Sequence, residues 1–588
     1  MNDSERPMTH PERAATAWLG AFEDALGSGD ACAIAALFQP DAHWRDVVAL
    51  TWTIETQTGA AAIAERIADT LARIRPRGFR LDPARTPPRV VTRAGTPCIE
   101  VLFVFETAFG TGNGVLRLVE DSASGRLRAW TFSTALMALH GHEERQGRSV
   151  PRIEEYARDF GGENWLDKRN RARAYMDHDP TVIVVGGGQA GLSIAARLGQ
   201  LGVDTLIVDR EARIGDNWRR RYHALTLHNE VHVNHLPYMP FPPTWPVFIP
   251  KDMLANWFEH YVDALELNFW VGTALTSGAW DDAAQCWHVT LRRADGSERL
   301  MRPRHLVFAT GVSSIPITPE LPGLEDFRGT LMHSGAYTEG AAWKGKHALV
   351  LGTGNSGHDV AQDLCAAGAK VSLIQRSPTY VVSLREAQSV YAIYTEGIPM
   401  EDCDLLATSF PFPVLKRGYQ ISTAASRAVD KTMLDGLAAR GMRLDYGPGD
   451  TGFQMKYLTR GGGYYFNVGC SDLIIDGKIG LLQFADIERF TAAGARMKDG
   501  RVVPADLLVT ATGYRNQQET VRAALGDAVA ESIGPVWDFD HGGELQNMWR
   551  PTAQPGLWFT AGSLAQCRIF SRFLALQIKA REEGLLNG

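Results

Sequence analysis

The chain has 588 residues, which at roughly 100–200 residues per domain indicates about three domains. Its content of 45% hydrophobic and 22% charged residues excludes global disorder, and its net charge of −7 lacks the basic excess expected of a nucleic-acid or membrane-surface protein. Seven widely spaced cysteines form no CxxC pair, so we expect no metal site and a reduced cytoplasmic compartment. The charged N-terminus and the lack of long apolar runs predict neither a signal peptide nor a membrane helix.

The first 145 residues combine helical and strand patterns. Apolar side chains recur at helical spacing over 12–25, and a second helix is expected near 59–74. Three stretches rich in β-branched and aromatic residues follow, at 97–109, 113–121 and 127–137. Helices followed by a strand meander predict an α+β domain over 1–145. The charged segment 146–179, punctuated by Pro and Gly, is expected to be a linker.

Beyond residue 180 the pattern changes to strand, glycine-rich turn, helix and strand, and it occurs twice. The first copy begins TVIVVGGGQAG and the second HALVLGTGNSG. Such βαβ units predict an α/β fold with two Rossmann-like dinucleotide-binding domains. We expect the first domain over 180–345, with a returning part at 481–588. The second is expected over 346–480, with a substrate-side insertion at 385–475.

The first glycine-rich turn has the spacing of a dinucleotide fingerprint. Gly186 permits the tight turn, Gly188 lets backbone amides approach a pyrophosphate, and Gly191 packs helix on strand. Asp209 follows Gly191 by 18 residues, at the end of the next strand, where a carboxylate accepts hydrogen bonds from a free ribose hydroxyl. A purely structural glycine turn is the less favoured alternative.

The second turn repeats the fingerprint with Gly352, Gly354 and Gly357, but no acid ends its next strand. Arg376 and Ser377 stand there instead, and an arginine can bind a ribose phosphate through charge-assisted hydrogen bonds. This favours NADPH over NADH, unless Arg376 is merely a solvated residue at a strand end. One site for a ribose hydroxyl and another for a ribose phosphate together point to a flavin reduced by NADPH.

The segment FRGTLMHSGAY lies between the two fingerprints and reads as FxGxxxHxxxY on Phe327, Gly329, His333 and Tyr337. With this motif the chain resembles the class B flavin-dependent monooxygenases, which include flavin-containing monooxygenases, plant YUCCA enzymes and Baeyer–Villiger enzymes. Baeyer–Villiger enzymes usually carry Trp at the last position, so Tyr337 favours the other branches. The segment 222–242 is especially similar to the YUCCA branch.

The resemblance implies FAD and NADPH as cofactors, and it adds residues around both fingerprints. The residues implied or derived for cofactor binding are Gly186, Gly188, Gln189, Ala190, Gly191, Asp209, Arg210, Gly215, Asn217, Trp218, His228, Thr310, Gly311, Gly352, Gly354, Asn355, Ser356, Gly357, Arg376, Ser377, Thr512 and Gly513.

Three residues are candidates for the catalytic centre. Many flavin-containing monooxygenases carry an Asn beside the flavin, and the aligned position here is His228, followed by Asn229. His333 belongs to the motif, which implies a conformational or cofactor-positioning role more than that of a general base. Tyr464 and Tyr465, in the run 461–469, are expected either to form a substrate lid or to pack on the flavin domain.

The resemblance implies a monooxygenase that forms a flavin hydroperoxide and transfers one oxygen atom of O2 to a small organic molecule. Sulfides, amines and indole-like nucleophiles are the expected substrates, with carbonyl compounds as an alternative. An oxidase or reductase that releases hydrogen peroxide is a rival, although a disulfide reductase would need a paired dithiol. A flavin-based redox-sensing binding module is a rival of another class.

The α+β domain at 1–145 is similar to an NTF2-like (SnoaL-like) cone, a fold used for small ligands and for dimers, which makes a homodimer plausible. His43, Trp44, Arg45, Asp46 and Trp52 are candidates to line its cavity. For an unassigned polar cluster of this kind, packing in the core or at the surface is the favoured interpretation over ligand binding or catalysis.

Overall fold

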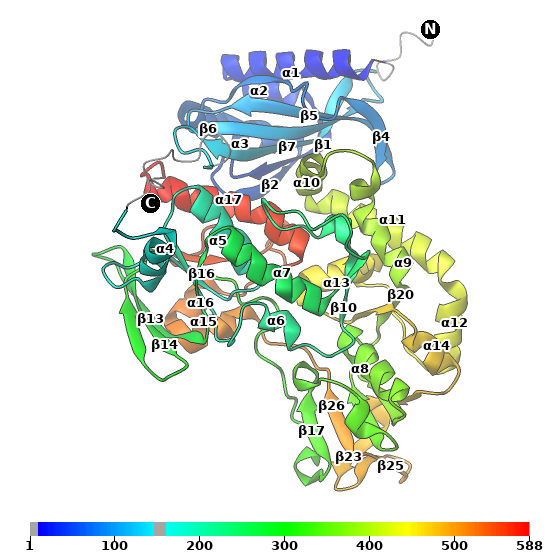
Figure 1. The fold of residues 1–588 in the computed structure, drawn as a ribbon. Coiled ribbons are helices and arrows are strands. Elements are labelled where there is room, and N and C mark those ends of the chain that lie inside the picture. Colours follow the sequence, from blue (N-terminus) through cyan, green and yellow to red (C-terminus); the bar gives the residue numbers. More distant parts are fainter. Residues whose placement is uncertain (1–9, 146–159, 587–588) are drawn as a thin grey trace.

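The computed structural model, which describes residues 10–145 and 160–586, begins with an α+β domain (Figure 1). Its helices are α1 (Pro11–Ser28), α2 (Ala31–Ala35) and α3 (Ala60–Ile74). Its strands are β1 (Phe38–Val47), β2 (Ile54–Thr58), β3 (Arg77–Leu81), β4 (Arg89–Arg93), β5 (Thr96–Glu106), β6 (Gly110–Glu120) and β7 (Leu127–Leu139). They form a sheet in the order β2-β1-β7-β6-β5-β3, with β4 beside β5. The predicted helices and strand meander are confirmed, and assignment to the NTF2-like group stays a prediction.

Aromatic rings fill the space between this sheet and its helices. Phe103 and Phe105 lie flat against two glycines of β6, where an added Cβ would come within 2.1 Å of Phe103 at Gly114 and 2.2 Å of Phe105 at Gly112. Phe22 of α1 joins the same cluster, with its ring centroid 5.2 Å from that of Phe79. The interior of the domain is therefore a packed core.

The candidate cavity residues at 43–46 separate onto two faces, because successive side chains of a strand point to opposite sides. Trp44 and Asp46 are fully buried, and Thr134 links them, accepting from Trp44 Nε1 (3.0 Å) and donating to Asp46 Oδ1 (2.6 Å). Arg45 points the other way, toward Glu544. The packing interpretation thus fits Trp44 and Asp46.

A parallel sheet in the order β12-β9-β8-β16-β27 forms the first dinucleotide domain. Its strands are β8 (Val182–Val185), β9 (Thr205–Val208), β12 (Asn268–Trp270), β16 (His305–Phe308) and β27 (Leu557–Phe559), and its helices are α5 (Gln189–Gln200) and α17 (Leu564–Glu582). Figure 1 shows α17 between α5 and the N-terminal sheet, and it contacts both α5 and β7. Smaller elements surround this sheet: α4 (Trp165–Ala174), α6 (Asp216–Arg219), β10 (Thr226–Glu230), β11 (Phe248–Pro250), α7 (Lys251–Ala264), β13 (Thr273–Asp281), β14 (Cys286–Arg293) and β15 (Glu298–Met301).

A second parallel sheet, in the order β17-β26-β18-β19-β22, forms the other dinucleotide domain. It contains β17 (Thr330–His333), β18 (His347–Leu351), α8 (Asn355–Ala366), β19 (Lys370–Gln375), β22 (Gly480–Gln483) and β26 (Leu507–Thr510). A three-stranded antiparallel sheet of β23 (Ile487–Thr491), β24 (Gly494–Met497) and β25 (Val502–Pro504) follows β22 in the chain. The predicted boundaries assigned 330–333 and 507–510 to the first domain, yet both strands pair here. The short apolar pattern of a buried strand is the same in either sheet, so it cannot tell which sheet the strand joins.

The predicted insertion at 385–475 is largely helical. It includes α9 (Leu384–Ala387), the 3-10 segment η8 (Gln388–Thr395), α10 (Met400–Thr408), α11 (Phe412–Val429), α12 (Lys431–Ala439), α13 (Gly452–Arg460) and α14 (Cys470–Ile475). Its two ends are held together by β20 (Tyr380–Ser383) and β21 (Tyr464–Asn467), which pair in parallel. After the second sheet, α15 (Gln517–Leu525) and α16 (Asp527–Ile533) lead the chain back to the first.

The outer face of the N-terminal sheet docks on the insertion and on the C-terminal segment through charged contacts. Arg45 binds Glu544 with two hydrogen bonds, of 2.7 and 2.6 Å. Arg85 pairs with Asp402 of α10 (2.6 Å), and Arg117 donates to Ser409 (2.9 Å). Within the described ranges, no helix is long and apolar enough to span a bilayer.

We predict that Glu544→Ala destabilises the protein by about 3–5 kcal/mol, because it leaves Arg45 buried without its counter-ion. The two side chains are only 11% and 7% exposed. The midpoint of denaturant unfolding measures the effect, with Asp435→Ala as control, since Asp435 pairs with Lys431 on an exposed helix surface. Equal losses in the two variants would contradict a stabilising role for the docking pair.

Candidate active site

The first glycine-rich turn is shaped by contacts that exclude side chains. Gly186 has φ +109°, and an added Cβ would lie 2.6 Å from the carbonyl oxygen of Ala309 on the neighbouring segment. A Cβ on Gly191 would lie 1.9 Å from the carbonyl oxygen of Gly186. Strand and helix therefore approach so closely that only glycine fits, and the start of α5, capped at Gly188, faces the turn as in pyrophosphate-binding folds.

Asp209 is fixed beside this turn. One carboxylate oxygen accepts the backbone N–H of Gly187 (2.6 Å) and the other accepts that of Glu211 (2.9 Å). The carboxylate thus lies at the end of β9, where the fingerprint requires a ribose acceptor. Arg210, the next residue, is exposed.

Several predicted residues close around the same turn. Trp218 Nε1 donates to Gln189 Oε1 (3.3 Å), and Gln189 Nε2 donates to the carbonyl of Gly562 (3.2 Å). Asn217 lies where a Cβ on Gly188 would come within 2.9 Å of its Nδ2. Ala190 is buried in α5.

Two further observations support a fit for a dinucleotide at this turn. The Thr310 hydroxyl is buried and, among the residues placed by the structure, has no hydrogen-bond partner. Gly215 (φ +84°) and Gly311 (φ +72°) adopt backbone conformations that favour glycine. A buried hydroxyl without a partner, beside glycines that let a ligand approach the backbone, suits the polar groups of FAD. We call the glycine-rich turn at Gly186 the first cradle and the one at Gly352 the second cradle.

The second turn repeats this construction. Gly352 has φ +120°, with its Cβ position 2.4 Å from the carbonyl oxygen of Ala511, and a Cβ on Gly357 would lie 2.0 Å from the carbonyl oxygen of Gly352. Asn355 Oδ1 accepts the backbone N–H of Phe466 (2.9 Å), so β21 lies against the start of α8. The backbone of Tyr464 borders Gly354, whose Cβ would stand 3.6 Å away, and Ser356 is partly exposed beside them.

At the end of β19, Arg376 and Ser377 are exposed, as a ribose-phosphate site requires. Arg443 joins them: its Nη2 donates to the carbonyl of Arg376 (2.7 Å), and its backbone N–H donates to Gln375 (2.8 Å). Sequence reasoning missed Arg443 because it lies 67 residues further along the chain, in the insertion, without a local motif.

His333 joins the end of β17 to the turn after β26. Its Nε2 lies 3.2 Å from the carbonyl oxygen of Gly513, and its Nδ1 accepts the backbone N–H of Gly335 (3.1 Å). Both ring nitrogens are therefore engaged by backbone, which favours positioning over general-base chemistry. In the same turn, Thr512 Oγ1 donates to the carbonyl of Ile317 (2.5 Å).

His228 and Asn229 lie on β10, and the ring of His228 contacts a residue beside the second turn. The His228 ring packs against Phe466, with centroids 4.7 Å apart, while the backbone of Phe466 is bonded to the second turn. The side chain of His228 is exposed, yet the surrounding protein lowers its pKa to about 4.

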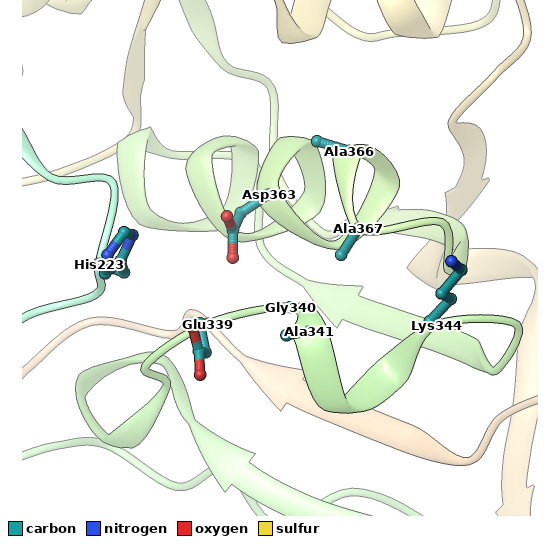
Figure 2. A pocket seen from close by; sticks show the side chains of 8 residues that line it. All are labelled: His223, Glu339, Gly340, Ala341, Lys344, Asp363, Ala366 and Ala367. Atoms are coloured by element: carbon teal, nitrogen blue, oxygen red, sulfur yellow. The ribbon is translucent and has the colours of Figure 1, made fainter.

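A separate pocket of about 370 Å³ lies elsewhere (Figure 2). It is formed by His223, by the segment from Glu339 to Lys344, and by Asp363 and the alanines at the C-terminal end of α8. The glycine-rich turn lies at the opposite end of that helix, so this pocket is not part of either cradle.

Comparison with known proteins agrees with the geometry. The pyridine nucleotide-disulphide oxidoreductase family matches residues 180–394. The chain is 34% identical over 373 residues to indole-3-pyruvate monooxygenase YUCCA1 of Oryza sativa subsp. japonica, covering 63% of this chain and 84% of that protein. This chain belongs to the flavin monooxygenase family. Probable indole-3-pyruvate monooxygenase YUCCA4 of Arabidopsis thaliana is 30% identical, over 57% of this chain and 76% of that protein.

The fold is also shared with solved structures. The open crystal structure of cyclohexanone monooxygenase superposes with a TM-score of 0.52 at 19% identity, over 69% of this chain and 88% of that one. The enzyme is therefore a flavoprotein oxidoreductase, and its family together with its two cradles supports FAD and NADPH as cofactors. All seven cysteines are free.

Two tyrosines tie α8 of the second domain to other segments. Tyr222, which precedes β10, donates to Asp359, and Tyr337 of the motif donates to Asp363 (2.6 Å). Burial raises the pKa of Asp359 to about 6 from 3.8. The contact between the two domains therefore contains a group that titrates near neutrality.

We predict that the pH dependence of stability distinguishes Asp359→Asn from the native protein. Since the folded pKa lies above the unfolded one, the native protein loses stability as the pH rises from about 4 to 6. The Asp359→Asn variant lacks this loss. Its melting temperature, measured relative to that of the native protein, should therefore rise as the pH increases from about 4 to 6. Thermal unfolding at several pH values measures it, with exposed Asp435→Asn as control. A difference between the two melting temperatures that stays constant with pH would contradict the assignment.

Proposed function

We propose that this enzyme binds FAD at the first cradle and NADPH at the second, and that it transfers one oxygen atom of O2 to a small organic substrate. The observation that carries this proposal is the pair of glycine-rich turns in one chain, the first beside the carboxylate of Asp209 and the second beside the exposed Arg376. Bound FAD supplies the centre that accepts a hydride from NADPH and reacts with oxygen.

The residues of the chain itself bind the two cofactors and shield them from water. Asp209 accepts a ribose hydroxyl at the first site, and Arg376 and Ser377 bind the ribose phosphate at the second. Burial lowers the pKa of His228 to about 4, so His228 is uncharged at neutral pH and brings no acidic proton to the site. Packed aromatic rings, including Phe453 at 4.7 Å from Phe466, exclude water. Asn229 is proposed to orient the substrate or the reacting oxygen.

The proposed substrates are sulfides, amines or indole-like nucleophiles, with a carbonyl compound as the alternative. The proposed setting is the cytoplasm, with a homodimer as the proposed assembly. For the N-terminal domain we propose an NTF2-like fold that supports the insertion, since its interior is packed with rings and its outer face carries the docking contacts.

Stopped-flow absorbance tests the proposed function. The purified protein is reduced by NADPH without oxygen and then mixed with oxygenated buffer. A transient near-ultraviolet band before the oxidised flavin spectrum returns is the expected result. Direct return with stoichiometric peroxide release, with or without candidate substrates, would instead indicate an oxidase, and failure of NADPH to reduce the protein would favour a binding module.

We predict that Arg376→Ala raises the KM for NADPH at least tenfold and leaves the KM for NADH nearly unchanged. A charge-assisted contact to phosphate contributes roughly 1.5–3 kcal/mol, and only NADPH has the ribose phosphate. Rates of flavin reduction against cofactor concentration measure it. Arg440→Ala, a change in an arginine near Gly477, is the control. An equal rise in the KM for both cofactors would show that Arg376 does not bind the ribose phosphate.

A further inference from the structure

Strand β10, which carries His228 and Asn229, pairs with β11 at its two ends. Thr226 lies opposite Pro250 and Glu230 lies opposite Phe248, and the register shifts between these two pairs. Hydrogen bonds from outside this ladder must therefore hold the backbone in the middle of the strand, where the two candidate residues lie.

The side chain of Gln388, at the start of η8, supplies two of these hydrogen bonds. Its Nε2 donates to the carbonyl of His228 (2.8 Å), and its Oε1 accepts the backbone N–H of Glu230 (3.3 Å). A carboxamide has the same kinds of donor and acceptor as a peptide group. Gln388 therefore takes the place that a neighbouring strand would have at this point of β10.

These contacts fix the backbone of Asn229. The His228 carbonyl and the Glu230 N–H belong to the two planar peptide units on either side of the Asn229 Cα, and φ and ψ of that residue are the torsions between the two planes. The Asn229 carbonyl, in the second unit, also accepts from Nδ2 of the buried Asn234 (2.9 Å). The direction in which the Asn229 side chain leaves the strand is therefore set by side-chain amides outside β10.

The other end of η8 is attached to the segment that follows β10. Tyr394 donates to Asp404 of α10 (2.7 Å), and Asp404 binds Arg568 of α17 through two hydrogen bonds, of 2.8 and 2.6 Å. Arg568 also donates to the carbonyls of Val233 (2.8 Å) and His235 (3.0 Å). Because of these contacts, a shift of η8 or α10 would also move the chain on either side of Asn229.

The N-terminal domain binds the chain directly after η8. The carboxylate of Glu396 pairs with Arg89 (2.6 Å) and Arg93 (2.5 Å) of β4. Both arginines also pair with Glu100 of β5, at 2.9 and 2.6 Å. Figure 1 shows α10, the next helix, beside the N-terminal sheet, and α10 contacts β6. Segment η8 is thus held by β10 at its start and by the N-terminal domain just beyond its end.

We propose that Gln388 is a positioning residue for Asn229, and that the N-terminal domain keeps Gln388 in place by binding Glu396. This role rests on the proposed function for its meaning in catalysis, since Asn229 is proposed there to orient the substrate or the reacting oxygen. A displacement of about 1 Å in a positioned group can lower a rate by about a hundredfold. The N-terminal domain, whose interior is packed, thereby contributes to the reaction through its docking face.

Hydrogen–deuterium exchange of the FAD-loaded full-length protein tests the contact, because Gln388 covers the Glu230 N–H. Gln388→Met keeps the length of the side chain and removes both hydrogen bonds, so the amides of 226–234 should exchange at least about tenfold faster. Gln420→Met is the matched control, since Gln420 lies in the same insertion and its Nε2 also donates to a carbonyl at 2.8 Å, that of Gly449. Exchange of this segment at the native rate in Gln388→Met overturns the proposal.

A second pair of variants tests the link to the N-terminal domain. Glu396→Gln breaks the ion pairs with β4 and leaves Glu100 to neutralise the two arginines, so the same amides should exchange about threefold faster. Glu55→Gln is the control. Glu55 is 21% exposed against 25% for Glu396, and it pairs with Arg66 inside the N-terminal domain (2.7 Å). Equal exchange in the two variants overturns the proposed link.

Stopped-flow absorbance separates positioning from general damage. Because Asn229 is assigned to the oxygen step, Gln388→Met should leave the rate of reduction by saturating NADPH within about twofold of the native rate. The return of the oxidised flavin spectrum in oxygenated buffer should change at least about fivefold. Equal changes in both rates, or no change in either, overturn the positioning role.

The exchange result can be separated from the test of the proposed function. If NADPH fails to reduce the native protein, the proposed function is rejected, and the exchange data still decide whether Gln388 holds β10. If the native protein forms the transient near-ultraviolet band and Gln388→Met exchanges at the native rate, the proposed function stands and the positioning role is rejected.

Discussion

The close approach of each glycine-rich turn to a carbonyl of the neighbouring strand end is the constraint on which the rest of the site depends. Gly186 meets Ala309, and Gly352 meets Ala511, at distances that no Cβ can occupy. Each contact draws the start of a helix to the carboxyl edge of its parallel sheet, where ligands bind in open α/β folds. At the second edge, Phe466 is bonded through its backbone to the start of α8, and it holds the ring of His228 against that site.

The sequence predicted the parts that depend on local pattern. Both βαβ units, the acid at Asp209 and the strand meander of the N-terminal domain follow from periodicity and spacing, and the structure contains each, whereas strands β1 and β2, which precede α3, were not predicted. The placement of β26 did not follow, because an apolar strand of four residues carries no record of its partners. Only the pairing of Leu507–Thr510 with Leu351 and its neighbours decides it.

The candidate site shows the same division. The fingerprint residues could be found because a turn needs them at fixed spacing, whereas Arg443 reaches the second site from an insertion with no motif of its own. His333 shows a further limit: its motif identified it, but only the contacts with Gly513 and Gly335 indicate what its ring nitrogens do. Long-range geometry, and not residue type, carries that information.

The docking face of the N-terminal sheet has a consequence for how the chain is made. Arg45 pairs with Glu544, which lies 499 residues further along the chain, and Arg85 pairs with Asp402, which lies 317 residues further along. Domains fold from the N-terminus during synthesis, so this domain is complete long before its partners leave the ribosome. The docking face of the N-terminal sheet is rich in arginine. The positive charge of these arginines keeps the uncovered face hydrated and repels the same face of a second copy. Because the docking contacts are polar, the N-terminal domain can remain without self-association until the last tenth of the chain has been synthesised and covers this face.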